Sequence, residues 1–310
     1  MQVEVVRGGL VESVHEVSLV ALDPAGDPFL TAGDPGWVVY GRSALKPAQT
    51  VAALRAGADL TDVEVAIASA SHSGEPVHLD AVTALLTRHG LSPDDLGCIP
   101  DLPLGVDAMH AYLAAGGTAT PLAMNCSGKH AAMLVAAGGD PGYLDPEHPL
   151  QRGCRDALAE LAGPVRAAST DGCGAPAFAT TLADLARLPL ALAGAADPVV
   201  ARVAGAMRAY PHLVAGTGRL DTVLMDALPG AVAKSGAEGV LVAALPDGSA
   251  VAAKAADGAA RALGPALLAV LDTAGIPVPD AVRAVAAPAV VGGGRDVGEL
   301  RVRADPSLTG

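Results

Sequence analysis

The sequence predicts an α+β fold, in which one antiparallel sheet is built from both chain ends around a helical insert. Segments with alternating or β-branched apolar residues occur near the N-terminus, at 14–20, and again near the C-terminus, at 239–245 and 297–302. The region from about 76 to 212 has mostly helical spacing of its apolar residues. Because strands and helices are segregated along the chain, alternating β-α units are not favoured.

In the first third of the chain we expect strands across 3–39, interrupted by a turn at 23–27. A helix is expected at 45–54, entered at Ser43 or Ala44, and a short buried strand or other buried segment at 63–68. The next helix, at 76–88, has proline in its first turn and glycine after its end. Further helices are expected at 105–115, 128–137, 149–161, 177–188 and 198–210.

The last third returns to strands. They are expected at 232–235, 239–245, 250–254 and 297–302, with a helix at 259–274. The chain has no internal repeat and no linker-like stretch. We therefore predict a single domain over 1–310, with a helical subregion at about 76–212 and a sheet subregion from about 3–40 and 230–302.

Composition limits the function classes. The 310 residues include 33 acidic and 20 basic side chains, which gives a formal net charge of −13. Such a chain is expected to bind neither nucleic acid nor a membrane surface. Hydrophobic residues make up 51% and aromatic residues only 2%, so the expected core consists of Ala, Val and Leu.

The sequence also indicates the compartment. Four cysteines in a chain of this length are not a disulfide framework. The first residues lack the basic and apolar regions of a signal peptide, and the uncharged stretch at 108–128 is interrupted by two glycines and a proline. We therefore predict a cytoplasmic protein with reduced thiols and no membrane span.

The first candidate motif, Ser43-Ala44-Leu45-Lys46, contains one of only four lysines in the chain. Side chains three residues apart share a helix face, so this serine and lysine can meet. A buried lysine can lose its proton and then activate a serine hydroxyl as a nucleophile, which arginine cannot do. The alternative is a helix cap followed by a solvated lysine.

Two further motifs follow. Ser71-His72-Ser73-Gly74-Glu75 is a polar cluster after an apolar run, or else the loop before a helix with Ser73 as its cap. Lys234-Ser235-Gly236 lies at the end of an expected strand, and its alternative is a strand that simply ends in a turn. S-x-x-K, a Ser-x-polar motif and K-[ST]-G in this order are the signature set of serine β-lactamases and penicillin-binding proteins.

A fourth cluster contains the only asparagine, a lysine and two cysteines. It consists of Asn125-Cys126-Ser127-Gly128-Lys129-His130 and Asp171-Gly172-Cys173-Gly174. Two thiolates can hold a zinc ion, or both cysteines can be small buried residues. No C-x-x-C pair is present, so the spacing leaves both possibilities open.

Together these motifs resemble the L-asparaginase II family of the rhizobial type, a class of Ser/Lys asparaginases. The resemblance covers about residues 5–255 and rests on motifs in family order. They are Arg42-Ser43-Ala44-Leu45-Lys46-Pro47, Ser71-His72-Ser73-Gly74-Glu75, Asn125-Cys126-Ser127-Gly128-Lys129-His130, Asp171-Gly172-Cys173-Gly174 and Lys234-Ser235-Gly236-Ala237-Glu238-Gly239.

The resemblance implies a fold like that of serine β-lactamases and glutaminases, a homodimer, and hydrolysis of L-asparagine to L-aspartate and ammonia. It implies two catalytic pairs, Ser43 with Lys46 and Ser71 with Lys234. It also implies a zinc site near them, at Cys126, Lys129 and Cys173. Its candidates for contacting the ammonium and carboxylate groups of the substrate are Arg42, Glu75, Asn125 and Asp171.

The chain departs from β-lactamases, because Ser73 stands where they have asparagine and no glutamate is placed as a deacylation base. Because it would share the three Ser/Lys motifs, a glutaminase or a β-lactamase-like serine amidohydrolase is an alternative, although the cluster of Cys126 and Cys173 does not support it. A zinc-binding, amide-sensing protein without turnover is another. The sequence leaves open which serine is the nucleophile. It also leaves open whether zinc would be structural, regulatory or catalytic.

Overall fold

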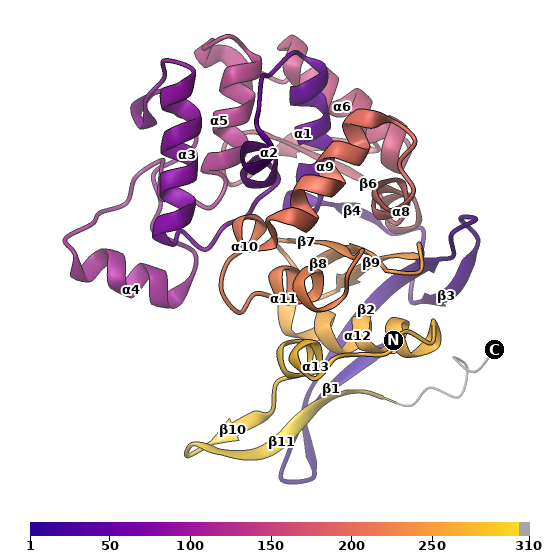
Figure 1. Cartoon of the computed structure of the whole chain (residues 1–310). Coiled ribbons are helices and arrows are strands. Elements are labelled where there is room, and N and C mark those ends of the chain that lie inside the picture. The colour runs from indigo at the N-terminus through magenta and orange to yellow at the C-terminus, as the bar shows by residue number, and fades with distance from the viewer. Residues whose placement is uncertain (304–310) are drawn as a thin grey trace. The chain divides into compact units, whose positions relative to one another are not determined.

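The computed structural model describes residues 1–303 and divides the chain into two compact units (Figure 1). Unit 1 comprises residues 1–44, 180–194 and the chain from 218 onward, and unit 2 comprises residues 45–179 and 195–217. That the whole chain is one domain stays a prediction.

Unit 1 is built on an antiparallel sheet. Within residues 1–303 its strand order is β10-β11-β1-β2-β9-β8-β7, and β3 pairs with β2. In Figure 1 the indigo strands β1 and β2 lie between yellow β11 and orange β9, so both chain ends contribute to one sheet. The prediction of an α+β fold with such a sheet is confirmed. The strands of unit 1 are β1 (Gln2–Arg7), β2 (Leu10–Leu22), β3 (Pro28–Ala32), β4 (Val38–Tyr40), β7 (Val232–Gly236), β8 (Val240–Ala244), β9 (Ala250–Ala255), β10 (Val290–Gly292) and β11 (Arg295–Val302).

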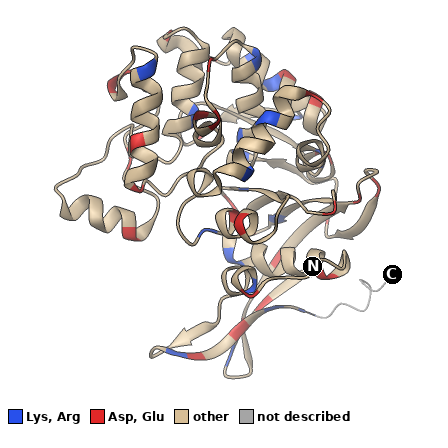
Figure 2. Ribbon diagram, viewed as in Figure 1, with Lys and Arg blue, Asp and Glu red and all other residues tan. Residues whose placement is uncertain are grey.

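The centre of this sheet is its most buried part. Every residue of β8 and β9 is buried. Helix α8 packs against both strands, and helix α12 packs against β9. At the other end the sheet carries cross-strand ion pairs, Arg7 with Glu12 and Arg301 with Glu4. Figure 2 shows residues of both signs along these strands. The helices of unit 1 are α7 (Leu182–Leu185), α8 (Arg187–Ala193), α11 (Leu220–Ala227), η4 (Ala260–Ala262), α12 (Leu263–Thr273) and α13 (Asp280–Ala286).

Unit 2 is mainly helical. A 3-10 turn, η1 (Arg42–Leu45), runs from unit 1 into α1, and α1 packs on α5, α6 and α9. Its core consists largely of Ala, Val and Leu, as the composition predicts. The remaining helices and strands of this unit are α1 (Lys46–Arg55), α2 (Asp62–Ala68), α3 (Pro76–Arg88), η2 (Pro93–Asp95), α4 (Val106–Ala114), α5 (Ser127–Ala136), η3 (Pro141–Leu144), α6 (Pro149–Ala162), β5 (Ala167–Thr170), α9 (Pro198–Ala209) and α10 (Pro211–Val214). Strand β6 (Pro176–Thr181) begins in this unit, and its last two residues belong to unit 1.

The predicted strand at 63–68 is wrong, because this segment is helix α2. Thr61 caps the helix by accepting a hydrogen bond from the Glu64 backbone, and the Glu64 carboxylate accepts one from the Thr61 backbone. This reciprocal pair stabilises a helix start and was visible as Thr61-Asp62-Val63-Glu64. The short apolar run after it fits a strand and a buried helix equally well.

The predicted helix at 177–188 is also wrong over its first half. Residues 176–181 form strand β6, which pairs antiparallel with β5, and helix α7 begins only after Thr181 caps it. Phe178 and two consecutive threonines favour a strand. Pairing with β5 fixes this segment as a strand. The pairing is a contact between two segments, and the periodicity of a single segment does not show it.

No single helix within residues 1–303 has the length and apolar character needed to cross a membrane. The consecutive segments Leu182–Ala193 and Pro198–Ala209 reach those limits only when they are counted together.

Candidate functional site

Lys46 and Ser71 meet in the interior of unit 2. Lys46 is the first residue of α1 and is only 1% exposed. Its Nζ donates hydrogen bonds to the Ala70 carbonyl and to Ser71 Oγ, the latter at 3.0 Å. Burial lowers the pKa of Lys46, and the charge of Lys129 lowers it further, although Cys126 acts in the opposite direction. A buried amine of this kind can exchange protons with a hydroxyl.

A second hydroxyl pair supports this contact. Thr50, one turn along α1, donates to the Lys46 carbonyl at 3.0 Å, and Ser69 Oγ donates to Thr50 Oγ1 at 3.0 Å. The start of α1 is thereby tied to the segment that carries Ser71. Neither Thr50 nor Ser69 was selected from the sequence, because neither belongs to a recognisable motif.

The segment 71–75 is held in an extended form by its neighbours. The backbone N–H groups of Ser71 and Ser73 donate to the carbonyls of Val214 and Ala215. A Cβ on Gly216 would collide with the Ser73 and Glu75 side chains, and one on Gly105 would lie 2.8 Å from Ser73 Cβ. Glycine therefore allows three segments to converge around Ser73.

Glu75 is the N-cap of α3 and is already well hydrogen bonded. Its carboxylate accepts bonds from the Thr217 backbone at 2.8 Å and hydroxyl at 3.0 Å, and His212 Nε2 lies 2.9 Å away. Burial tends to raise the pKa of Glu75, but the bonds from Thr217 and the charge of His212 outweigh it, so the pKa is lowered. The lowered pKa favours the ionised, carboxylate form of Glu75.

His72 is fully buried between Ser71 and Ser73. Its Nε2 lies 2.9 Å from Ser127 Oγ at the start of α5, and its backbone N–H donates to the Asn125 carbonyl. Burial, with the charges of His78 and Lys46, holds the pKa of His72 well below its ordinary value. The neutral ring thus connects the Ser71 segment to the motif at 125–130 without adding a charge.

Cys126, Lys129 and Cys173 lie together, all buried. Lys129 Nζ donates to Cys173 Sγ at 3.1 Å. A hydrogen bond from Cys173, together with Lys46 and Lys129, lowers the pKa of Cys126 well below its usual range against the effect of burial. Burial lowers the pKa of Lys129, but its interactions with Cys173 and Cys126 raise it overall. The cluster therefore pairs one thiolate and one thiol with buried amines.

The start of α5 reaches this position because Gly128 has no side chain. A Cβ there would overlap the Ile67 carbonyl oxygen of α2. We expect Gly128→Ala to destabilise the protein by about 1–3 kcal/mol through overpacking, measured as a fall in Tm of a few degrees. Gly205→Ala, at an exposed site on α9 with open space around the new Cβ, is the matched control and should raise stability by up to about 1 kcal/mol. An unchanged Tm in Gly128→Ala would contradict this close approach.

Asn125 and Asp171 flank the cluster. Asn125 Oδ1 lies 3.2 Å from Cys126 Sγ. Asp171 begins the tight turn between β5 and β6, where its N–H donates to the Ala175 carbonyl and its carboxylate accepts from the Gly172 N–H. Both residues thus lie beside cysteines of the cluster, in the order that the sequence suggested.

Unit 1 carries Arg42 and Ser43 in the turn η1. Arg42 has a left-handed backbone with φ 51°, a conformation that non-glycine residues adopt at a free-energy cost of about 1–3 kcal/mol and that clusters at functional sites. The strand that carries Lys234 approaches this turn closely. A Cβ on Gly236 would lie 2.7 Å from the Gly41 carbonyl and 3.2 Å from the Ala44 nitrogen.

Lys234 is buried on β7 and faces a carboxylate that the sequence analysis missed. Its Nζ lies 3.6 Å from Asp221 on α11, and both side chains are 1% exposed. Asp221 also accepts hydrogen bonds from the Ser235 backbone at 3.0 Å and from the Ser235 hydroxyl. Burial raises the pKa of Asp221, but Lys234 and the other polar neighbours lower it overall. No motif surrounds Asp221, so only the fold could reveal it.

The structure thus gathers the predicted residues within each unit. Unit 2 brings Lys46 to Ser71, the serine that the sequence analysis paired with Lys234, and places both near the cysteine–lysine cluster. Unit 1 brings the Lys234 strand to the Ser43 turn. Among the described residues, no three His, Cys, Asp or Glu side chains form a metal-binding group.

Comparison with known proteins agrees with these motifs. The family model described as L-asparaginase II matches residues 3–302, nearly the whole chain. The chain is therefore a hydrolase that acts on a small molecule. It belongs to the L-asparaginase II family.

Solved structures show only remote likeness. EstCE1, a hydrolase with promiscuous acyltransferase activity, has 16% sequence identity and a TM-score of 0.41, covering 78% of this chain and 89% of its own. A protein of Bacteroides dorei DSM 17855 that is provisionally named a β-lactamase has 17% identity and a TM-score of 0.37, covering 82% and 84%. No curated protein matches the sequence. The family assignment rests on the family model.

Proposed function

We propose that the protein is an L-asparaginase that hydrolyses L-asparagine to L-aspartate and ammonia through a serine acyl-enzyme. The observation that carries the proposal is the buried contact of Lys46 with Ser71, inside a chain that matches the L-asparaginase II family over residues 3–302. A lysine with a lowered pKa beside a serine is what amide hydrolysis by a Ser/Lys pair needs.

In the proposed reaction Ser43 Oγ attacks the side-chain amide carbon of asparagine, and Lys46 takes the serine proton. The tetrahedral intermediate expels ammonia when the C–N bond breaks and the leaving nitrogen gains a proton, which leaves an aspartyl ester on Ser43. Water then cleaves the ester, releases L-aspartate and restores the serine. Ser71 is the alternative nucleophile.

The oxyanion requires N–H donors at the carbonyl oxygen. We assign this role to the Ser43 N–H and to a backbone N–H of the Lys234 strand. The close approach of Gly236 to the Gly41–Ala44 turn supports this assignment, since both segments belong to unit 1 and no side chain separates them. Preorganised donors of this kind typically contribute about 2.7–4 kcal/mol each to lowering the barrier.

Ser71 and Lys234 form the second proposed pair and would relay a proton to the leaving ammonia. The ion pair of Lys234 with Asp221 supports this role, because it fixes the amine in place on β7. For recognition of the substrate's ammonium and carboxylate groups we propose Arg42, Glu75, Asn125 and Asp171. Glu75 and Asp171 supply negative charge and Arg42 supplies positive charge.

Zinc fits the donor set of Cys126, Lys129 and Cys173. Two thiol sulfurs are ligands that zinc prefers, one of them is already held as a thiolate, and Lys129 Nζ is 3.1 Å from Cys173 Sγ. Lys129 binds a metal only after losing its proton, so zinc binding should release protons. A bound zinc would supply a positive charge that orients and polarises a ligand beside Asn125 and Asp171.

Removing a zinc ligand should weaken substrate binding more than folding. We expect Cys126→Ala and Cys173→Ala each to abolish zinc in elemental analysis and to raise KM for L-asparagine, with a small fall in Tm. Cys154→Ala, at a buried cysteine of α6, is the matched control and should keep its zinc. Full zinc stoichiometry in Cys173→Ala would show that the ligand set is wrong. Unaltered kinetics after verified metal loss would show that the ion is incidental to binding.

Ammonia release tests the proposed function. The purified protein is incubated with L-asparagine and, separately, with L-glutamine, and the ammonia is measured in a coupled assay. We expect turnover of L-asparagine. Preference for L-glutamine would favour the glutaminase alternative, and zinc-dependent binding of L-asparagine without ammonia would favour an amide sensor. We also propose a cytoplasmic homodimer, which light scattering of the purified protein tests for its oligomeric state.

A further inference from the structure

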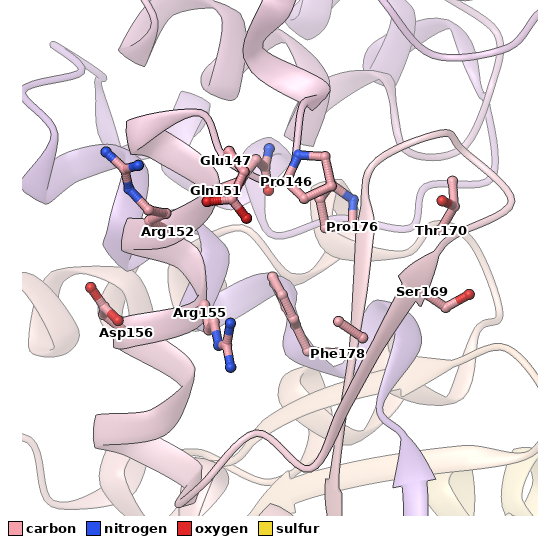
Figure 3. Close-up of a pocket in the computed structure, with 11 residues that line it drawn as sticks. Pro146, Glu147, Gln151, Arg152, Arg155, Asp156, Ser169, Thr170, Pro176 and Phe178 are labelled. Carbon is pink, nitrogen blue, oxygen red and sulfur yellow. The ribbon is translucent and has the colours of Figure 1, made fainter.

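A cavity in unit 2 lies between helix α6 and the β5–β6 hairpin, apart from the serines and lysines of the proposed reaction (Figure 3). Its volume is about 520 Å³. Small-molecule sites in proteins have volumes of roughly 300–1,000 Å³, so the cavity is large enough for an organic ligand. A lone inorganic anion would leave most of it empty.

Four charged side chains line the cavity, two of each sign: Arg152, Arg155, Glu147 and Asp156. Within the described part of the chain, none of the four makes an ion pair with another side chain. All four are exposed, so each can contact a ligand that enters the cavity. Charges of both signs at one cavity match a ligand that itself carries both charges.

One side chain of each sign, Arg155 and Glu147, lies at a different point along the cavity. Figure 3 shows Arg155 extending from α6 towards β6, beside Phe178, whereas Glu147 lies at the N-terminal end of the helix close to Gln151. A guanidinium binds a carboxylate through paired hydrogen bonds. A carboxylate accepts hydrogen bonds from an ammonium group.

Gln151 offers an additional acceptor near Glu147. The residue is 1% exposed, and its Nε2 donates to the Tyr143 carbonyl at 2.7 Å. Its Oε1 has no hydrogen-bond partner within residues 1–303. A buried polar atom without a partner is uncommon in native structures and calls for an explanation. An ammonium group bound beside Glu147 would supply the missing donor.

The remaining walls are apolar or bear hydroxyls. Phe178 and Pro176 are buried in strand β6, Pro146 is exposed, and Ser169 and Thr170 are exposed on β5. An aromatic ring can pack against Phe178 in an offset arrangement. Thr170 and Pro176 also flank the turn that contains Asp171 and Cys173, so a ligand here would contact both strands that hold this turn.

We propose that this cavity binds an α-amino acid with an aromatic side chain, at a site separate from the asparagine site. Arg155 binds the carboxylate, Glu147 and Gln151 bind the ammonium group, and Phe178 with the two prolines packs on the side chain. The proposal does not depend on the reaction assigned to the protein.

Isothermal titration calorimetry with three related probes tests the proposal. L-phenylalanine carries both charges, 3-phenylpropionate lacks the ammonium group and phenethylamine lacks the carboxylate. We expect L-phenylalanine to bind at one site per chain, and each single-charge probe to bind about tenfold more weakly or worse, since each loses a charge-assisted interaction.

The variants assign the two charges. Arg155→Gln should weaken the binding of L-phenylalanine and 3-phenylpropionate about tenfold and leave the binding of phenethylamine unchanged. Glu147→Gln should weaken the binding of phenethylamine and leave that of 3-phenylpropionate unchanged. Arg295→Gln, at an exposed arginine on β11, is the control and should bind all three as the unmodified chain does. Circular dichroism verifies that each variant is folded.

Three results would overturn the proposal. One is no binding of L-phenylalanine up to its solubility limit. Another is equal affinity in Arg155→Gln, which would place the ligand elsewhere. The third is displacement of L-phenylalanine by inorganic phosphate at equal concentration, or equal binding of 3-phenylpropionate, either of which would make the cavity a simple anion site.

Discussion

Ser43→Ala should reduce kcat for L-asparagine hydrolysis by at least about a thousandfold while the protein remains folded, because residues that act as one catalytic unit lose nearly all of their effect together. For the same reason, adding Lys46→Met to Ser43→Ala should lower the residual rate little further. The measurement is initial-rate ammonia release for both single variants and the double variant.

The control is Ser92→Ala, at an exposed serine before the 3-10 turn η2, which should keep the unmodified rate. Losses that simply multiply in the double variant would contradict a single Ser43–Lys46 unit. A large loss in Ser71→Ala together with near-normal activity in Ser43→Ala would make Ser71 the nucleophile. The Lys46–Ser71 contact would then be the catalytic pair.

Lys234→Arg should abolish most activity even though it preserves the positive charge. The guanidinium cannot act as a neutral amine, and its planar shape does not replace a compact donor. We expect kcat/KM to fall by about a thousandfold, equivalent to about 4 kcal/mol in the barrier. Because Asp221 still faces a cation, the melting temperature should change less than in Lys234→Met. That variant leaves a buried carboxylate unpaired, a loss of about 3–5 kcal/mol.

Lys254→Arg is the matched control for this substitution. Lys254 lies on β9, is also largely buried and has its amine 5.0 Å from the centre of the Trp37 ring. Arginine makes the same kind of cation–π contact, so activity should stay within about threefold. Equal activity in Lys234→Arg and Lys254→Arg would reduce Lys234 to an ordinary strand residue.

The elements that the sequence predicted correctly are those with long, regular patterns. The helices α1, α3, α6 and α9 repeat apolar residues with helical spacing, and several end near the expected residues. The segment at 63–68 is too short for its period to be decisive, and there the cap formed by Thr61 and Glu64 fixes the helix. Strand β6 depends on pairing with β5, which is a tertiary contact.

In the candidate site too, sequence patterns identified residues, whereas the contacts between them came only from the fold. Motifs identified Lys46, Ser71 and Lys234 because their residue types and order carry chemical meaning. They did not identify the contacts, since Lys46 reaches Ser71 across 25 positions of the chain. Asp221 was missed altogether, because a single aspartate in an amphipathic helix has no signature until the fold buries it against Lys234.

Covalent labelling tests the central claim, that a serine of the Ser/Lys motifs is acylated during amide hydrolysis. The protein is incubated with a diazoketone analogue of asparagine, digested and mapped by mass spectrometry, with excess L-aspartate as the protecting ligand. The account predicts one label per chain, on the peptide that contains Ser43, which is lost with L-aspartate and absent in Ser43→Ala. A label confined to a residue outside Ser43 and Ser71, or undiminished turnover in fully labelled protein, would contradict it.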